Sequence, residues 1–377
     1  MQKKFLILSV FIFLYVWISV YKYYHYVYNE EPIDVSKPLL DCTNIDLVYT
    51  WVNGTEPIHM ISRMKRLNIT LEEAKADSNR FRDLDGLKYS LRSFLQYAPW
   101  IRNVYIITDN QYPNWLNLEK TMNIDEFGFD VDMSESVLEK EERGNHEIRF
   151  IFHSDYFQNQ SDLPVFNSNA IEVNYYSLPD EVSECFISMN DDVYFGAPVK
   201  RDDFVHPIKG ILTYEDSAPI SAYDDTQELF AQSLRHSNSL LNKLWGVDNS
   251  RHLAEHGPIL FHKKVFEQMY KWIGDEMRET SSHAIRKSND LQLPFLHLHF
   301  TKRFFRSYTP KKSINKYAGL IDDLTKMKSL FKKLAGTDYK TVCLNDGLSA
   351  SDPNPQVLQL YHKSLNEKFP NKGYWEY

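Results

Sequence analysis

The chain has 377 residues, of which 43% are hydrophobic, 14% aromatic and 25% charged. This composition is typical of a globular protein and excludes a mostly disordered, collagen-like or disulfide-packed chain. The formal net charge of −8 argues against a general nucleic-acid-binding protein, because such proteins carry a basic excess on one face.

The N-terminus predicts a membrane anchor. Lys3 and Lys4 precede an apolar run over residues 5–21, whose length is near the lower limit for a helix that spans hydrocarbon. Tyrosines follow the run instead of the small residues of a signal-peptide cleavage site, and the two lysines favour a cytosolic N-terminus. We expect a cytosolic tip and uncleaved signal anchor over residues 1–28, a lumenal stem over 29–43 and a folded domain over 44–377.

The folded part begins with alternating strand and helix patterns. Residues 45–52 are rich in β-forming side chains and end at Asn53-Gly54, a turn signal. Apolar residues recur at helical spacing over 83–97, and residues 104–108 have the pattern of a short buried strand. Strand, helix and strand in this order predict a βαβ unit in a mainly parallel sheet.

Later segments extend this α/β pattern. Residues 119–147 are acidic and without periodicity, which predicts a solvated insertion. Strands are expected over 148–153 and 186–189, and helices over 168–177 and near 261–273, 289–300, 320–334 and 355–367.

Asp191 and Asp192 are the sharpest local feature. They follow a predicted buried strand, and open α/β sheets place their ligand crevice at the carboxyl ends of strands. Adjacent carboxylates there suit Mg²⁺ or Mn²⁺, which prefer oxygen ligands and can bridge to a diphosphate. An acidic turn without a metal is the simpler alternative.

Other candidates each have a structural alternative. Asp83 is a general base or a helix N-cap, and His256, expected to precede a helix, is a proton acceptor or an ordinary histidine. Arg286 and Asp290 are spaced as a surface ion pair, with a phosphate clamp as the sharper option. Trp51 could stack a nucleobase or fill the core.

The cysteines Cys42, Cys185 and Cys343 allow at most one disulfide. Three buried thiols are the simpler interpretation. A bridge between Cys42 and Cys343, which would tie the stem to the C-terminal region, is the alternative.

Taken together, several segments resemble the Stealth family of hexose-1-phosphate transferases. The matching blocks are residues 45–54 (IDLVYTWVNG), 80–92 with 98–110, 166–172 (FNSNAIE) with 186–196, 256–259 (HGPI) with 283–290, and 343–346 (CLND). They occur in the family's order over residues 45–377 and are more specific together than any one of them. Gly86 departs from the family, in which an acid often stands at this position.

The resemblance implies a Rossmann-like, glycosyltransferase-A-like α/β core with a mainly parallel sheet flanked by helices, a helical C-terminal part, a nucleotide-sugar donor and a divalent metal, Mg²⁺ or Mn²⁺. It further implies a glycan or glycoprotein acceptor. The predicted anchor indicates a single-pass type II protein of the Golgi or secretory-pathway membrane with a lumenal catalytic domain, and the net charge argues against a nucleic-acid partner. A homodimer is a further expectation. Carried over by position, the catalytic residues are Asp83, His256, Arg286 and Asp290, the donor-binding residues are Trp51, Asn53, Gly54, Asn110, Asn167 and Ser168, and the metal ligands are Asp191 and Asp192.

The expected reaction transfers a sugar-1-phosphate, N-acetylglucosamine-1-phosphate first among the candidates, from a UDP-sugar to a glycan hydroxyl, with release of UMP. Two alternatives remain open. A metal-dependent glycosyltransferase would use the same crevice and release UDP, and a non-catalytic lumenal protein would bind the nucleotide sugar without turnover.

Overall fold

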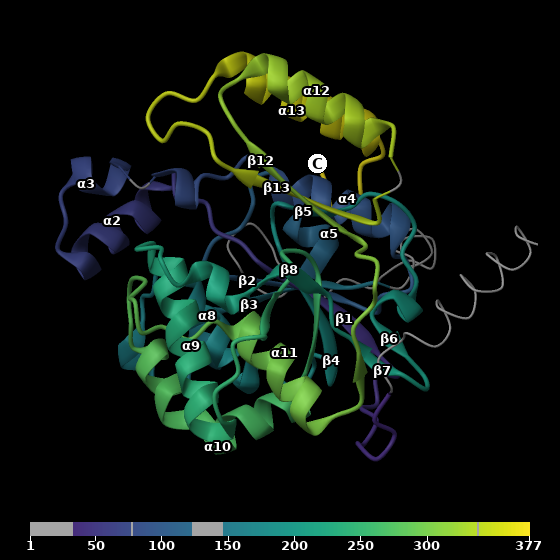
Figure 1. Ribbon diagram of the computed structural model, residues 1–377. Helices are drawn as coiled ribbons and strands as arrows, with labels where there is room; N and C mark the ends of the chain where they lie inside the picture. Colours follow the sequence, from purple (N-terminus) through teal and green to yellow (C-terminus); the bar gives the residue numbers. More distant parts are fainter. Residues whose placement is uncertain (1–32, 77, 123–145, 338) are drawn as a thin grey trace, which may run out of the picture.

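The computed structural model describes residues 33–76, 78–122, 146–337 and 339–377. Its centre is a five-stranded sheet of order β10-β4-β1-β2-β3 (Figure 1). The strands are β1 (Ile45–Thr50), β2 (Val104–Thr108), β3 (Ile148–Phe152), β4 (Cys185–Asn190) and β10 (Ile259–His262). The first four run parallel and β10 runs antiparallel to β4, which confirms the predicted mainly parallel α/β sheet.

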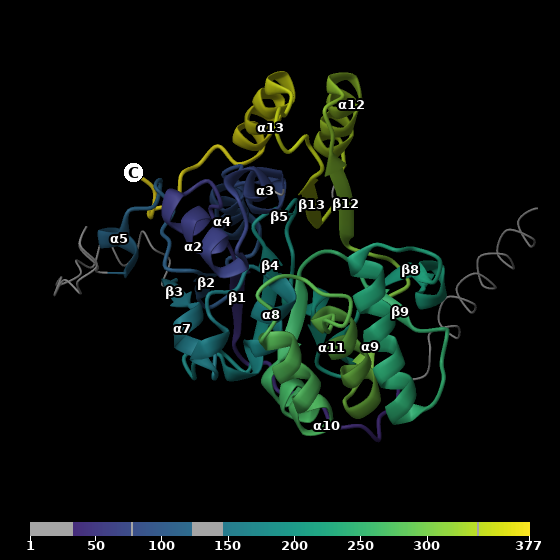
Figure 2. The ribbon, with the colours of Figure 1, turned by 90° about the vertical axis from the view of Figure 1, so that its left-hand side faces the viewer.

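Helices cover the sheet, and its central strands are therefore buried on both faces, as is usual for parallel strands. Every residue of β2 and all but the last of β1 are buried. Among the helices of the main body are α4 (Gly86–Tyr97), α8 (Ser168–Val173), α9 (Leu229–Trp245), α10 (Lys263–Ser281) and α11 (Leu293–Phe304). Figure 2 shows α9, α10 and α11 gathered beside one another in the lower part of the molecule.

The strand order contains a switch point beside β1. From β1 the chain passes through α4 to β2 on one side, and it returns later to β4 on the other side of β1. Ligands of open α/β sheets bind outside the carboxyl ends of the strands at such a point. Thr50 ends β1 and Asn190 ends β4, so these two residues locate the expected crevice.

A C-terminal lobe stands above this edge of the sheet (Figures 1 and 2). It consists of α12 (Leu324–Ala335), α13 (Pro355–Lys368) and a three-stranded sheet of β12 (Asn315–Leu320), β13 (Thr341–Asp346) and β5 (Val193–Phe195). Its separate core joins Met327, Phe331 and Tyr194 of the lobe to Tyr89 of α4 in the main body. Because β5 directly follows Asp192, the lobe is attached at the predicted metal ligands.

Smaller elements complete the described structure. They are the helices α2 (Pro57–Leu67), α3 (Leu71–Ala76), α5 (Leu118–Met122) and α7 (His153–Tyr156), and the strands β6 (Val205–His206), β7 (Gly210–Leu212), β8 (Glu215–Pro219), β9 (His252–Ala254) and β11 (Ser307–Tyr308). Short 3₁₀ helices occupy Ser78–Phe81, Gln160–Asp162, Asn174–Ser177, Arg201–Asp203 and Ile220–Tyr223.

Two sequence predictions need correction, and a third is not tested. Residues 261–262, expected to be helical, belong to β10, because Ile259–His262 pairs with β4. The helix expected from residue 83 begins at Gly86. Most of the predicted insertion, residues 123–145, lies outside the described residues.

The predicted location in a membrane is also wrong on the present finding. None of the helices in the described part of the chain has the length and apolar content that crossing a bilayer requires. The proposed anchor, residues 1–28, lies outside the described residues.

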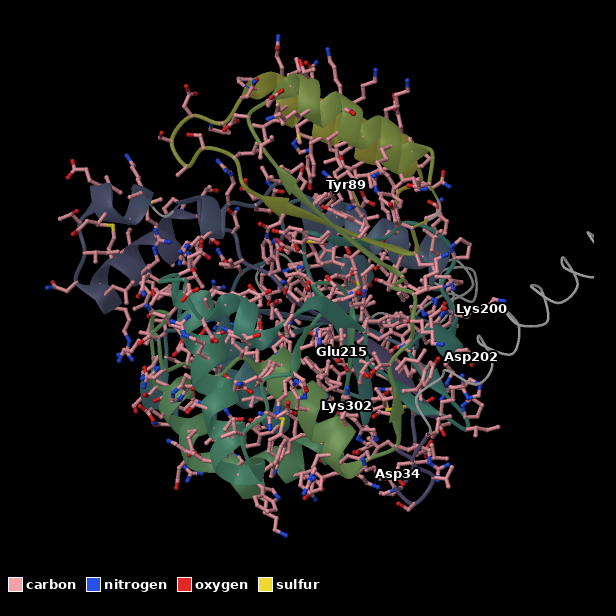
Figure 3. All side chains as sticks on the ribbon, viewed as in Figure 1. Asp34, Tyr89, Lys200, Asp202, Glu215 and Lys302 are labelled. Atoms are coloured by element: carbon pink, nitrogen blue, oxygen red, sulfur yellow. A yellow bond between two sulfur atoms is a disulfide. The ribbon has the colours of Figure 1, made fainter. Side chains whose placement is uncertain are left out.

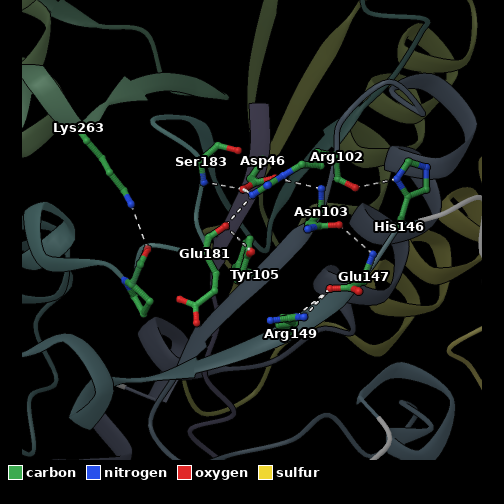
Figure 4. A network of polar contacts seen from close by, with 11 residues as sticks. Asp46, Arg102, Asn103, Tyr105, His146, Glu147, Arg149, Glu181, Ser183 and Lys263 are labelled. Atoms are coloured by element: carbon green, nitrogen blue, oxygen red, sulfur yellow. Dashed lines mark hydrogen bonds and ion pairs between the residues drawn. The ribbon is translucent and has the colours of Figure 1, made fainter. Parts of the chain in front are cut away.

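A polar network fixes the strands at the edge of the sheet opposite the crevice (Figure 4). The buried Asp46 carboxylate of β1 accepts hydrogen bonds from Arg102 Nε at 2.8 Å and from the backbone N–H groups of Asn103 at 3.1 Å and Ser183 at 2.7 Å. Arg102 and Asn103 precede β2, and Ser183 precedes β4. One carboxylate thus joins the amino-terminal ends of three neighbouring strands.

A disulfide joins Cys42 to Cys185, and Cys343 is a buried free thiol. Both interpretations of the sequence, three free thiols and a bridge between Cys42 and Cys343, are therefore wrong. Cys185 opens β4 and lies opposite Ile45 of β1, which brings the segment before β1 next to it.

Removal of this disulfide is expected to destabilise the fold. The cross-link closes a loop with a sequence separation of 143 residues, and by chain entropy such a loop contributes about 5 kcal/mol. Urea unfolding of the C42S/C185S variant should show a loss of this size. Dithiothreitol should destabilise the unsubstituted chain and leave the variant unchanged; equal stability of the two proteins without reductant would contradict the expectation.

Candidate active site

Two carboxylates lie at the switch point of the sheet. Asp191 and Asp192 follow β4 directly, and beside them the Thr50 hydroxyl of β1 donates to Asn190 Oδ1 at 3.3 Å. The predicted position of Asp191 and Asp192, directly after a buried strand at its carboxyl end, is confirmed.

The acids perturb one another. Asp191 is half-buried, and burial, followed by the charges of Asp192 and Asp83, raises its pKa well above the usual range. Burial and the charge of Asp85 raise the pKa of Asp83 to about 6. Carboxyl groups whose pKa is raised by burial and by neighbouring acids, at the ligand-binding end of a sheet, are typical of functional sites.

Asp192 is held from the C-terminal lobe. Its Oδ2 accepts a hydrogen bond from Asn345 Nδ2 at 3.3 Å and lies 3.6 Å from the Cys343 thiol. Its Oδ1 is buried and has no hydrogen-bond partner among the described residues. A buried carboxylate oxygen without a donor, next to a second acid, fits a divalent cation, since Mg²⁺ is commonly bound by one or two carboxylates together with substrate phosphates.

Asp83 does not cap α4. Its Oδ1 accepts from the Asp85 N–H at 2.8 Å, while Asp85, at φ 58°, occupies the N-cap position without a side-chain cap bond. The next residue, Gly86, lies so close to the acids that a Cβ there would come within 2.5 Å of the Asp191 carbonyl oxygen. The loop before α4 is therefore packed directly on the segment that carries Asp191.

Asp83→Asn is expected to stabilise the protein at neutral pH. A carboxyl whose folded pKa is raised makes its favourable contribution at acid pH and loses it as the pH rises from its ordinary value of 3.8 to about 6. The amide removes this cost, which is about 2 kcal/mol for a partly buried group. Urea unfolding should show the gain near pH 7 and not near pH 4; an equal gain at both pH values would contradict the electrostatic cause.

The predicted donor-binding turn lies after β1. Trp51 is 5% exposed; its indole lowers the pKa of Asp83, although the indole nitrogen does not reach hydrogen-bond geometry with any described residue. The Asn53 N–H donates to Gln111 Oε1 at 3.1 Å, and a Cβ at Gly54 would meet Phe81 Cβ at 2.2 Å. Asn110, at φ 54°, ends the neighbouring turn after β2. These residues line the same edge of the sheet as the acids.

A second group of predicted residues surrounds the start of α8. Arg286 Nη2 donates to Ser168 Oγ at 2.8 Å. Asp290 is fully buried and accepts from Asn167 Nδ2 at 2.9 Å and His283 Nδ1 at 2.7 Å. The predicted surface ion pair between Arg286 and Asp290 is therefore wrong. Asp290 instead stabilises the loop that carries Arg286.

Sequence reasoning missed Glu172, which lies on α8 and is half-buried. Burial raises its pKa to about 7, and the charge of Arg286 opposes this shift. Burial, followed by the charge of Glu172, raises the pKa of Tyr175. Glu172 shares α8 with Ser168, which accepts a hydrogen bond from Arg286, so it belongs to the group of residues around Arg286. A single glutamate on a short helix carries no periodic signal, although the FNSNAIE block contains it.

His256 lies on the loop between β9 and β10, not before a helix as predicted. It is exposed, and its ring contacts Tyr317 of β12 edge to face at 5.4 Å between centroids. Tyr317 is paired with Cys343 in the register of β12 and β13, and the Cys343 thiol lies 3.6 Å from Asp192 Oδ2. This chain of contacts links His256 to the acid cluster. Asp83 and His256 are not joined by a hydrogen bond in the described residues.

Among the described residues, one group of three His, Cys, Asp or Glu side chains has ligand atoms within 4.8 Å of one another: Cys42, Cys185 and His262. The two sulfurs form the disulfide, and both ring nitrogens of His262 contact the backbone. This group therefore does not replace the acid cluster as a candidate metal site.

Comparison with known proteins adds family matches. Stealth protein conserved region 1 matches residues 43–69, conserved region 2 matches residues 80–126 and 135–212, and conserved region 3 matches residues 255–303. Every predicted site residue lies within these regions.

The relatives named as phosphotransferases are distant in sequence. An exopolysaccharide phosphotransferase of Streptomyces coelicolor is 27% identical over 88% of this chain and 33% of its own length. A capsular polysaccharide phosphotransferase of Haemophilus influenzae is 28% identical over 85% of this chain and 82% of its own length. The chain thus spans about a third of the Streptomyces protein. Among solved structures, the galactosyltransferase LgtC aligns with a TM-score of 0.40 and 8% identity, covering 86% of this chain and 96% of that one.

Proposed function

This chain belongs to the Stealth family, and on that premise we propose that it is a phosphotransferase. It moves a sugar-1-phosphate, N-acetylglucosamine-1-phosphate by preference, from a UDP-sugar to a hydroxyl of a glycan acceptor. The observation that supports this proposal is the convergence of Asp83, Asp191 and Asp192 at the switch point, where burial and neighbouring acids raise the pKa of Asp83 and of Asp191.

In this reaction the acceptor oxygen forms a bond to the sugar-bound phosphorus, the bridging P–O bond to UMP breaks, and UMP leaves with the electron pair. Phosphoryl transfer depends on positioning and charge neutralisation. Asp191 and Asp192 would hold Mg²⁺ or Mn²⁺, and the bound ion would offset the charge of the diphosphate.

The remaining residues have roles that follow from their chemistry. Arg286, oriented by Ser168 and by the loop that Asp290 organises, would add positive charge beside the transferred phosphate. His256 would accept the acceptor proton, with Asp83 as its partner in this task. The turn at Trp51, Asn53 and Gly54, with Asn110, Asn167 and Ser168, would receive the nucleotide and the sugar.

The test is product analysis. The purified chain is incubated with UDP-N-acetylglucosamine, Mg²⁺ or Mn²⁺ and a panel of glycans, and the nucleotide by-product is identified by chromatography. UMP together with a phosphodiester product supports the proposal. UDP would indicate a glycosyltransferase, and binding of the donor without nucleotide release would indicate a non-catalytic protein.

A further inference from the structure

Helix α12 of the C-terminal lobe presents a basic face. Its sequence LTKMKSLFKKLA contains lysines 326, 328, 332 and 333, all exposed, and no acidic residue. Met327 and Phe331 are buried on the opposite side in the core of the lobe. Nitrogen-tipped side chains extend outward from this part of the lobe in Figure 3.

Most of this positive charge is not neutralised locally. Asp323 caps the helix and lies 3.6 Å from Lys326. Within the described ranges, Lys328, Lys332 and Lys333 form no ion pair. Because the chain as a whole has a net charge of −8, this face is a local exception, and three adjacent free ammonium groups attract an anionic partner at distances up to the screening length.

The basic face is connected to the candidate active site. Strand β12 leads into α12, and the paired strand β13 carries Cys343 and Asn345, which contact Asp192. Arg82, just before Asp83, forms an ion pair at 2.8 Å with Asp346 at the end of β13. A polymer bound on the lobe would therefore be held by the same element that contacts Asp192.

We propose that the face of α12 formed by Lys328, Lys332 and Lys333 binds the anionic phosphodiester groups of an acceptor glycan already extended by earlier transfers. The inference rests on the proposed function, because each transfer would add one negative phosphodiester to the acceptor. Binding at this face would keep the charged product on the enzyme for further extension.

The test is binding without turnover. Synthetic oligomers of hexose-1-phosphate units, fluorescently labelled, are titrated with the full chain in the absence of donor, beside an uncharged dextran of equal length. The K328Q/K332Q/K333Q variant should bind the charged oligomer about ten-fold more weakly than the unsubstituted chain near 0.05 M NaCl, and the difference should shrink near 0.5 M NaCl. The matched control K75Q/K243Q/K271Q removes three exposed lysines from α3, α9 and α10 and should bind within about two-fold of the unsubstituted chain.

Equal weakening in the two triple variants would overturn the proposal, since net charge rather than this face would then decide binding. Preference for dextran, or for vesicles of phosphatidylglycerol over the charged oligomer, would overturn it as well. Because no donor is present, a failure of the proposed transfer reaction leaves this readout intact, and the two failures can be told apart.

Discussion

Asp192→Asn is expected to lower kcat by about 10³-fold or more, because a carboxylate that positions a divalent cation contributes several kcal/mol to the transition state. The Asp191→Asn variant should lose activity to a similar extent. Burial and neighbouring acids raise the pKa of Asp191, so its replacement by a neutral amide relieves repulsion and should raise the melting temperature. Loss of activity together with gain of stability would separate a catalytic effect from misfolding.

The control for these variants is Asp202→Asn, which removes an exposed carboxylate labelled in Figure 3. Its activity and melting temperature should remain close to those of the unsubstituted chain. If Asp191→Asn and Asp192→Asn kept activity within a few-fold of this control, the acid pair would not be part of the catalytic centre.

His256→Ala is expected to reduce kcat by about 10²–10⁴-fold, the usual contribution of a positioned general base. His256 is exposed and its recorded ring contact is with Tyr317, so little stability should be lost. Steady-state kinetics at saturating donor, with a melting curve for each protein, measure both effects.

The matched control is Tyr317→Ala, which removes the same ring contact and leaves the imidazole in place. It should retain activity within about ten-fold of the unsubstituted chain. If His256→Ala were as active as this control, the base would have to be another group. Glu172, whose pKa is raised to about 7 by burial, would then be examined through Glu172→Gln.

Much of the central sheet could be predicted because its strands are local in sequence. Each pattern is complete within one short stretch of sequence. This holds for the apolar runs of β1, β2 and β4 and for the helical spacing of α4. The lobe at Asp192 could not be predicted in the same way. Strand β5 has three residues, and it becomes a strand by pairing with the distant β13.

The same reason explains what was missed in the site. The i,i+4 spacing of Arg286 and Asp290 implies contact only on a helix, but α10 ends at Ser281 and α11 begins at Leu293. The partner of Cys42 depended on the register that sets Ile45 of β1 opposite Cys185. By contrast, Asp191 and Asp192 could be placed from sequence, since a buried strand leads directly to them.

The measurement that tests the central claim most directly follows one oxygen atom. In this measurement, the donor is a UDP-sugar that carries ¹⁸O at the oxygen bridging the anomeric carbon and phosphorus. The purified chain converts it to products, which are analysed by mass spectrometry. Attack at phosphorus keeps the bridging oxygen bonded to the sugar. The label should therefore be found in the phosphodiester product, and the nucleotide should be unlabelled UMP. Recovery of the label in UDP would show attack at the sugar carbon and contradict the account.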